Sequence, residues 1–284
     1  MNERWIITGI LILLFNGCVY EREFPFMDSS PKLVMNCTFS PDRLWKIHIG
    51  KTYPLNGDIL SNSVSLESAQ VILIEDGVYK EQLVWTPGNY FMSIKNKPRA
   101  GSLYRVEVNC AGFEQLKADD ICPSRVVLND MRIGREKSGR VWIDVEIDNA
   151  LRGFFIFYAR QRSQNKVLNL KIMTEDPAFE FNANTSIKYH HYLFLEKHTI
   201  GSGKYFIRLY LEPDIFKLGL PVEVVLNHCS QDYWIYMYTL QLYNYGILNK
   251  LYSNVTGGVG IFAGYQSSSV CARVIVEQGF SEFR

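Results

Sequence analysis

The chain has 284 residues, of which 47% are hydrophobic and 21% charged, a globular composition with enough apolar residues for one large or two ordinary domains. The formal net charge is +1 and there is no basic tract, which argues against a nucleic-acid partner. Aromatic residues make up 14%, including 17 tyrosines, which suit half-buried positions on β-sheets because the ring packs while the hydroxyl stays wet.

Residues 1–17 have the order of a secretory signal peptide. Arg4 lies in a polar start, residues 5–15 are apolar apart from Thr8, and Gly17 precedes Cys18. The apolar segment is shorter than the roughly 20 residues of a membrane-spanning helix. Because a cysteine after a small residue resembles a bacterial lipobox, we predict lipidation of Cys18 and a lipidated tether over 18–31. The alternative is an ordinary cleaved signal, or an uncleaved anchor, in which Cys18 has no role.

Residues 32–120 alternate as β-strands do. Trp45, Ile47 and Ile49 fall on one face of a predicted strand, and Lys46 and His48 fall on the other. An apolar run over 71–74 ends in a hairpin-type turn, and further turns follow at 87–90 and 100–101. This segment is therefore predicted to be an N-terminal antiparallel β-sandwich.

Residues 121–284 are predicted to be a second, C-terminal β-rich domain, joined through a linker near 121–124. Strands are expected over 141–147, 154–158, 205–211, 222–226 and 270–276, while 161–199 is either a long insertion or a set of hairpins. The fold class predicted for the whole chain is mainly β. It consists of two antiparallel β-sandwich units of immunoglobulin or transthyretin type, with one helix in the C-terminal half.

That helix is expected near 230–243. Ser230 is a suitable N-cap and Asp232 lies in the first turn, where the helix dipole favours negative charge. Apolar and aromatic residues occur nearly all round it, which predicts either core packing, the preferred interpretation, or a contact surface. The aromatic residues assigned to such a partner surface are Trp234, Tyr238, Tyr243 and Tyr245.

The cysteine count limits disulfide bonding. Six cysteines become five if Cys18 carries lipid, so not all can pair within one chain. Cys37 and Cys110 both point into the predicted N-terminal core and form one candidate disulfide. Two buried free thiols are an equal alternative, and Cys110 with Cys122 is a competing pair.

A motif near the C-terminus carries a family resemblance. Residues 251–262 read Leu-Tyr-Ser-Asn-Val-Thr-Gly-Gly-Val-Gly-Ile-Phe, and the chain resembles the Bacteroidota outer-membrane lipoprotein family of domain of unknown function 4249. Other segments agree in order: 31–34, 68–71, 88–90, 101–104 and 232–236. The segment 244–246 departs from the family, whose members usually continue into Asn-Pro-Phe.

The resemblance implies a lipid-anchored outer-membrane protein that acts beside a TonB-dependent receptor, with the membrane contacted through the N-terminal lipid. It implies no ligand and no catalytic residue. Glu21 and Glu23 beside the anchor resemble surface-export signals and favour the cell-surface face over the periplasmic one; a solvated linker is the alternative.

The family motif itself is expected to be structural, with its named positions at Asn254, Gly257, Gly258, Gly260 and Phe262. Glycines provide positive φ or allow close backbone approach at a bend between strands. A phosphate-binding loop would instead require a strand followed by a helix.

No catalytic or metal-binding pattern is present, so we predict no enzyme activity, no metal and no cofactor. His190 and His191 are adjacent on a predicted strand and so point to opposite faces. Asp144, Glu146 and Asp148 share one strand face, where a solvated surface is preferred over a calcium site. The leading hypothesis is an accessory or ligand-capture lipoprotein of a TonB-dependent transporter. The alternatives are a structural or adhesive surface subunit and, third, a hydrolase with scattered catalytic residues.

Overall fold

A computed structural model describes residues 31–53, 65–148, 152–163, 166–180, 187–198, 203–213, 217 and 219–273. The chain divides into two compact units, Met1–Pro31 with Tyr53–Asn62 and Lys32–Thr52 with Ser63–Arg284. Only two described residues fall in the first unit, so the fold below is that of the second. The predicted signal peptide, Cys18 and all of the tether except Pro31 lie outside the described residues.

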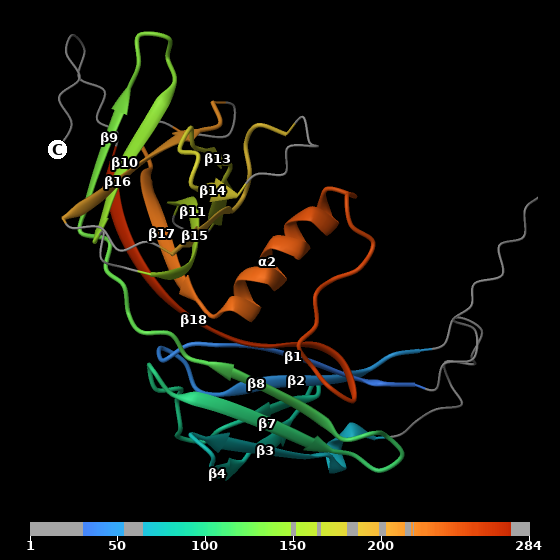
Figure 1. The fold of residues 1–284 in the computed structure, drawn as a ribbon. Helices are drawn as coiled ribbons and strands as arrows, with labels where there is room; N and C mark the ends of the chain where they lie inside the picture. The colour runs from blue at the N-terminus through green and yellow to red at the C-terminus, as the bar shows by residue number, and fades with distance from the viewer. Residues whose placement is uncertain are drawn as a thin grey trace, which may run out of the picture. The chain divides into compact units, whose positions relative to one another are not determined.

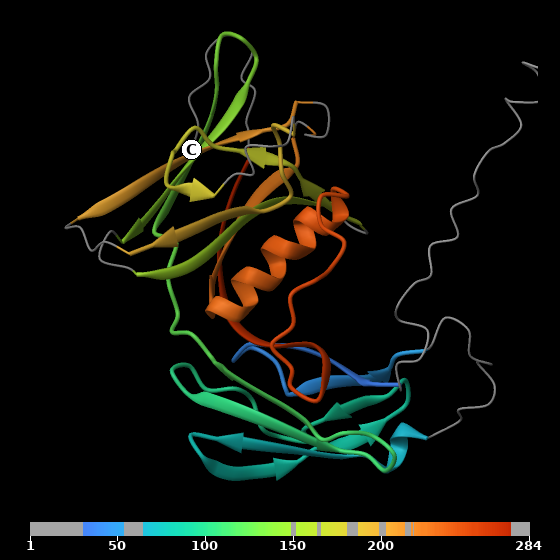
Figure 2. The ribbon, with the colours of Figure 1, turned by 45° about the vertical axis from the view of Figure 1, so that its right-hand side comes forward.

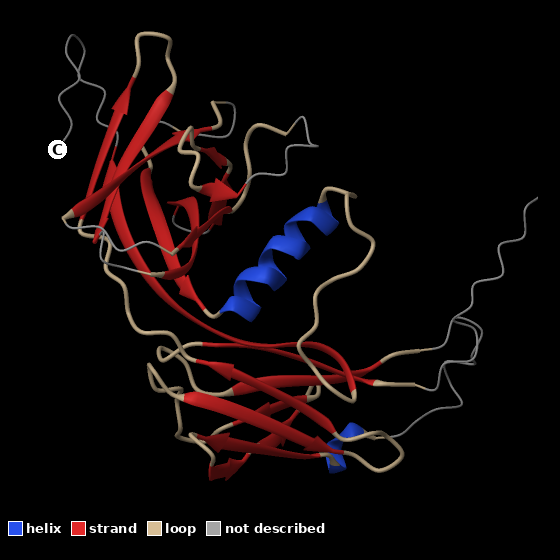
Figure 3. Cartoon of the chain, viewed as in Figure 1, coloured by secondary structure: helices blue, strands red, loops and turns tan. Residues whose placement is uncertain are grey.

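The described residues are mainly β, as predicted, with one long helix (Figure 3). In the N-terminal half the elements are β1 (Leu33–Phe39), β2 (Lys46–Lys51), η1 (Leu66–Ser68), β3 (Gln70–Glu75), β4 (Val78–Gln82), β5 (Val84–Thr86), β6 (Tyr90–Met92), β7 (Leu103–Asn109) and β8 (Leu116–Ile121). They are followed by β9 (Asp130–Arg135), β10 (Val141–Asp148), β11 (Gly153–Ser163), β12 (Lys166–Leu170), β13 (Ile172–Met173), β14 (Phe179–Glu180), β15 (Leu193–Lys197), β16 (Lys204–Leu211), β17 (Pro221–Cys229), α2 (Gln231–Asn244) and β18 (Gly258–Arg273).

These strands form three sheets. The largest has ten strands in the order β14-β15-β11-β17-β18-β1-β2-β6-β5, with β12 also paired to β11. The other two have four strands each, in the orders β13-β16-β10-β9 and β4-β3-β7-β8. The segment 161–199, left open between an insertion and hairpins, contains the short strands β12 to β15.

The alternation in the sequence does mark the buried faces. Trp45, just before β2, and Ile47 and Ile49 within it are buried as predicted. They join a core to which β1, β2 and β6 of the large sheet contribute, together with β3, β7 and β8 of the β4-β3-β7-β8 sheet. A second core lies between β9, β10 and β16 and one face of β11 and β17, where Phe155 and Phe157 are fully buried. Removing these apolar side chains from water is the main driving force for both cores.

One long strand joins the two cores. The first half of β18 pairs in parallel with β1, from Leu33 opposite Gly258 to Phe39 opposite Gly264. Its second half pairs antiparallel with β17, from Cys229 opposite Tyr265 to Pro221 opposite Arg273. Figures 1 and 2 show this strand running from β1 to β17 and passing the helix on the way. A single sheet therefore continues across the division predicted at residues 120 and 121.

Candidate functional site

The helix α2 lies on the large sheet, and its position creates the hollows described below. Ser230 acts as the predicted N-cap, because its Oγ accepts a hydrogen bond from the Tyr233 backbone N–H at 3.1 Å. The helix packs on buried side chains of β11, β17 and β18, among them Ile156, Cys229 and Ile261. Neither face of the sheet is therefore left bare at this point, since the opposite face of β11 and β17 lies against the second core.

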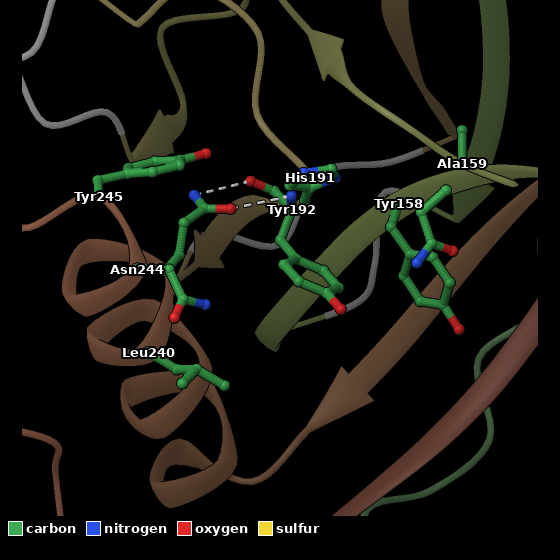
Figure 4. A pocket seen from close by; sticks show the side chains of 9 residues that line it. Tyr158, Ala159, His191, Tyr192, Leu240, Asn244 and Tyr245 are labelled. Carbon is green, nitrogen blue, oxygen red and sulfur yellow. Dashed lines mark hydrogen bonds between the residues drawn. The ribbon is translucent and has the colours of Figure 1, made fainter. Parts of the chain in front are cut away.

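A first hollow of about 250 Å³ lies between the C-terminal part of α2 and β11 (Figure 4). The side-chain amide of Gln241 holds this arrangement: its Oε1 accepts from the Tyr192 N–H at 3.0 Å and its Nε2 donates to the Tyr192 carbonyl at 3.2 Å. Both bonds are visible in Figure 4 as dashed lines. The lining residues are Tyr158, Ala159, Asn169, His191, Tyr192, Leu240, Gln241, Asn244 and Tyr245.

A second hollow of about 390 Å³, here called the polar cavity, shares Tyr158 and Tyr192 with the first. Tyr233 of α2 and Tyr265 of β18 complete a group of four rings, here called the tyrosine cluster. The rings of Tyr233 and Tyr265 are stacked with centroids 4.8 Å apart, and those of Tyr158 and Tyr192 meet edge to face at 5.7 Å. The remaining lining residues are Ser40, Asp42, Arg43, Arg160, Val225, Asn227, Met237, Ser267, Ser268 and Ser269.

The electrostatics of the polar cavity favour neutral groups. Burial raises the pKa of Tyr158 and of Tyr192, and that of Tyr233 rises well above its usual range through burial and the neighbouring Cys229, so these hydroxyls stay protonated at neutral pH. The guanidinium of Arg160 is bound by Glu223 in a bidentate pair, with Nε–Oε2 at 2.7 Å and Nη2–Oε1 at 2.9 Å. Hydrogen bonds, chiefly from Arg160, lower the pKa of Glu223 to about 2, so this carboxylate offsets the charge of the guanidinium that lines the cavity. Arg162, which does not line the cavity, binds the same carboxylate at 3.0 Å.

The predicted partner surface is only partly exposed. Trp234 is 8% exposed because it packs against Phe154, Phe194 and Tyr238, so it does not belong to an outer surface. Tyr238 is half-buried, Tyr245 lines the first hollow, and Tyr243 is exposed at 47%. The helix therefore contributes mainly to the core, which is the interpretation that the sequence favoured.

The family motif supports the fold through its backbone contacts. Gly257 lies at the expected bend, with φ +78°. Gly258 is the first residue of β18, and Gly260, with φ +127°, lies within that strand. A Cβ on Gly260 would overlap the backbone of Met35 in β1, and one on Gly258 would overlap the carbonyl of Leu33. Close approach of two backbones, and not ligand binding, therefore explains these glycines.

Asn254 of the same motif bonds to the edge of β18. Its Oδ1 accepts from the Phe262 N–H at 3.0 Å, and its Nδ2 donates to the Phe262 carbonyl and to Asp232 Oδ2, each at 2.8 Å. The amide thus bonds both backbone groups of Phe262, as a neighbouring strand would, and connects them to the first turn of α2. Phe262 is itself buried beside Phe39 and Trp45 in the N-terminal core.

The cysteines of the two candidate disulfides are free thiols. Cys37, Cys110 and Cys122 are all buried in the N-terminal core, so neither pairing is formed in the structure. Burial raises the pKa of Cys110, and it raises that of Cys122 to about 12. These side chains contribute as small hydrophobic residues.

The acidic strand face is occupied by ion pairs. Asp144 binds Arg208 through two bonds of 2.6 Å, and Lys204 lies 2.8 Å from Glu146, which is buried rather than solvated. His190 is buried and His191 exposed, in line with their expected opposite directions. Within the described ranges, no group of three or more His, Cys, Asp or Glu side chains is arranged to hold a metal ion.

A functionally informative residue that the sequence does not single out is Asp120. It is buried at the end of β8, and its Oδ2 accepts from the Gly264 N–H of β18 at 2.7 Å. Burial raises its pKa to about 6, despite hydrogen bonds from Ser230 and from the backbone that favour the charged form. Alternation alone identifies Asp120 as an inward-facing polar residue, but only the fold supplies its partner.

We expect stability to depend on pH through Asp120. Its folded pKa lies above the unfolded value of 3.8, so the folded state binds more protons and stability falls as pH rises from about 4 to about 6. Asp120→Asn lacks this titration. Its free energy of unfolding relative to wild type should therefore increase by about 1–3 kcal/mol between pH 4 and pH 7, as measured by urea denaturation.

The matched control is Asp119→Asn, on the same strand. Asp119 is exposed and paired with Arg105, so its substitution should change stability by less than about 1 kcal/mol at either pH. An Asp120→Asn difference that stays constant from pH 4 to pH 7 would contradict the assignment.

The fold and the site together define a class: a mainly β protein with two adjoining, tyrosine-lined hollows beside the helix α2. The chain belongs to the family described as domain of unknown function DUF4249, whose model matches residues 20–270. No curated protein matches the sequence. In the part of the chain that the structure describes, no helix combines the length and hydrophobicity needed to cross a membrane.

Similarity to solved structures is slight. The chain is 8% identical to the structure named "Putative membrane anchored protein from Corynebacterium diphtheriae", with a TM-score of 0.23, and the match covers 90% of this chain and 62% of that one. It is also 8% identical, with a TM-score of 0.20, to the structure of manganese lipoxygenase of Gaeumannomyces graminis with part of zonadhesin of Komagataella pastoris; that match covers 86% of this chain and 96% of the other. At these scores the likeness carries no argument.

Proposed function

We propose that this protein is a lipid-anchored outer-membrane protein that captures a small ligand in the two hollows beside α2 and works with a TonB-dependent transporter. The observation that supports ligand capture is the pair of adjoining hollows, about 250 and 390 Å³, which share Tyr158 and Tyr192. Sites for small molecules are concave and usually measure about 300–1,000 Å³, a range that the larger hollow reaches by itself. The ligand is bound and released unchanged in this proposal, and no catalytic group acts on it.

The cellular setting is proposed from the N-terminal sequence and the family resemblance. Cys18 after Gly17 would carry the lipid, and Glu21 and Glu23 would favour the cell-surface face of the membrane. We also propose that the two cores belong to β-sandwiches of immunoglobulin or transthyretin type in a Bacteroidota lipoprotein. Such a protein would present its hollows to a barrel in the same membrane.

The test is purification of the tagged protein from native outer membranes in mild detergent, followed by mass spectrometry of its companions. We expect a TonB-dependent barrel in about one-to-one ratio. Cys18→Ala should leave the membrane fraction and lose the barrel, because a lipid chain supplies the membrane affinity. Recovery of the wild-type protein alone or as self-polymers contradicts the transporter proposal and favours the structural or adhesive alternative.

A further inference from the structure

The polar cavity is lined mainly by hydroxyl groups. Four tyrosines and four serines surround its volume of about 390 Å³, together with the amide of Asn227. Two of these polar groups hold each other in place, because Ser267 Oγ donates to Asn227 Oδ1 at 2.7 Å. The side chain of Ser268, the next residue of β18, points to the opposite face, where its Oγ accepts from the Leu128 N–H of the second core at 3.0 Å. The wall formed by β17 and β18 therefore presents hydroxyl and amide groups in fixed positions.

The tyrosine hydroxyls, in contrast, are not used by the fold. Across the described segments of the chain, no hydrogen bond joins the hydroxyl of Tyr158, Tyr192, Tyr233 or Tyr265 to another group, although Tyr233 is only 8% exposed. These side chains line the cavity, so water or a ligand in it can bond to their hydroxyls. The cavity thus offers several hydroxyls, each able to donate and to accept.

The charged side chains that line this cavity do not favour an ionic ligand over a neutral one. The guanidinium of Arg160 is bound by Glu223, and Asp42 and Arg43 at the exposed rim are neighbours of opposite charge. No cation remains deep in the cavity to attract an anion. The aromatic rings and neutral polar groups fit a ligand that combines C–H faces with many hydroxyls.

We propose that the hollows bind a neutral carbohydrate, with one sugar unit in the polar cavity and the next in the first hollow, beyond Tyr158 and Tyr192. This inference rests on the proposed ligand-capture function and names its ligand class. The tyrosine cluster supplies hydrogen bonds to sugar hydroxyls and ring contacts to sugar C–H groups. Ser267 of β18 and Asn227 of β17 orient the sugar through further hydrogen bonds.

The test is isothermal titration calorimetry on the full-length lipoprotein in a detergent without a sugar head group, because maltoside and glucoside detergents would compete for the site. The neutral probes are maltose, cellobiose and diacetylchitobiose, each at up to about 10 mM, a range that detects millimolar dissociation constants. The comparison probes are sialyllactose and trialanine. We expect at least one neutral disaccharide to bind more tightly than sialyllactose and more tightly than trialanine.

The variants Tyr158→Phe and Tyr233→Phe remove one hydroxyl each and keep the ring. Each should weaken binding about 3- to 10-fold, the effect of one neutral hydrogen bond, with an unchanged melting temperature. The matched control is Tyr79→Phe on β4, which is 63% exposed and lines neither hollow, and it should bind as wild type does.

The carbohydrate assignment is overturned if none of the three neutral disaccharides binds, if sialyllactose or trialanine binds more tightly, or if both tyrosine variants bind as wild type does. Its failure is distinguishable from failure of the proposed function. If a transporter co-purifies but the protein binds none of these sugars, the carbohydrate assignment is wrong and the transport role is supported. If a sugar binds but no transporter co-purifies, the carbohydrate assignment is supported and the transport role is wrong.

Discussion

Gly260→Ala is expected to destabilise the protein by at least about 4 kcal/mol and to prevent stable folding if the total stability is ordinary. The glycine has φ +127°, a conformation that side chains rarely adopt, and an added Cβ would overlap the backbone N, C and O of Met35. Backbone atoms in a paired strand cannot move aside as a flexible side chain does. The parallel pairing of β1 with β18 would have to separate.

The control for this prediction is Gly112→Ala. Gly112 also has a positive φ, +83°, but no atom lies within 4 Å of the position of its added Cβ. Its substitution should therefore cost only about 1–2 kcal/mol, the conformational part of the effect. Both variants can be compared by urea denaturation, with circular dichroism to report the β-structure. Equal losses in the two variants would show that strand approach contributes nothing.

Asn254→Ala is expected to reduce the free energy of unfolding by about 3–4 kcal/mol, because it removes three hydrogen bonds at once. Two of these satisfy the N–H and the carbonyl of Phe262, and the third reaches Asp232 at the start of α2. The Phe262 backbone groups would then need water in a place where the side chain of Phe262 is fully buried. Amide exchange at Phe262 should accelerate together with the loss of stability.

Two further asparagine variants test whether the effect comes from the hydrogen bonds of Asn254. Asn254→Asp keeps the acceptor for the Phe262 N–H but loses both donated bonds and places a second carboxylate beside Asp232, so we expect it to be no more stable than Asn254→Ala. Asn129→Ala is the neutral comparison, since Asn129 is exposed and its side chain makes no hydrogen bond to another described residue. Its effect should stay within about 0.5 kcal/mol. An Asn254→Ala variant as stable as Asn129→Ala would refute the bridging role.

Local pattern was sufficient for much of the fold. Alternation identified the buried side of β2 through Trp45, Ile47 and Ile49, because successive side chains of a strand point to opposite faces. Ser230 marked the start of α2, because a serine Oγ satisfies one of the free N–H groups of a first turn. Both signals depend only on neighbours in the chain, so a single sequence carries them.

The predictions that the structure does not confirm depended on contacts between distant parts of the chain. Trp234 and Tyr243 looked alike on the helix, yet only the position of Phe154 and Phe194 decides that Trp234 is buried and Tyr243 exposed. Cys37 and Cys110 do share a core, as alternation predicted, but a common core does not fix the separation of two thiols.

The amino-acid sequence by itself determined that this protein is mainly β, where its long helix begins, and which family it belongs to. Tertiary structure alone decided that β18 joins β1 to β17, that Asn254 completes a strand edge, and that Tyr158, Tyr192, Tyr233 and Tyr265 line one cavity. The physical reason is that periodicity records which side of an element is buried, whereas a binding site depends on which elements meet. That choice is made by packing among residues far apart in the chain.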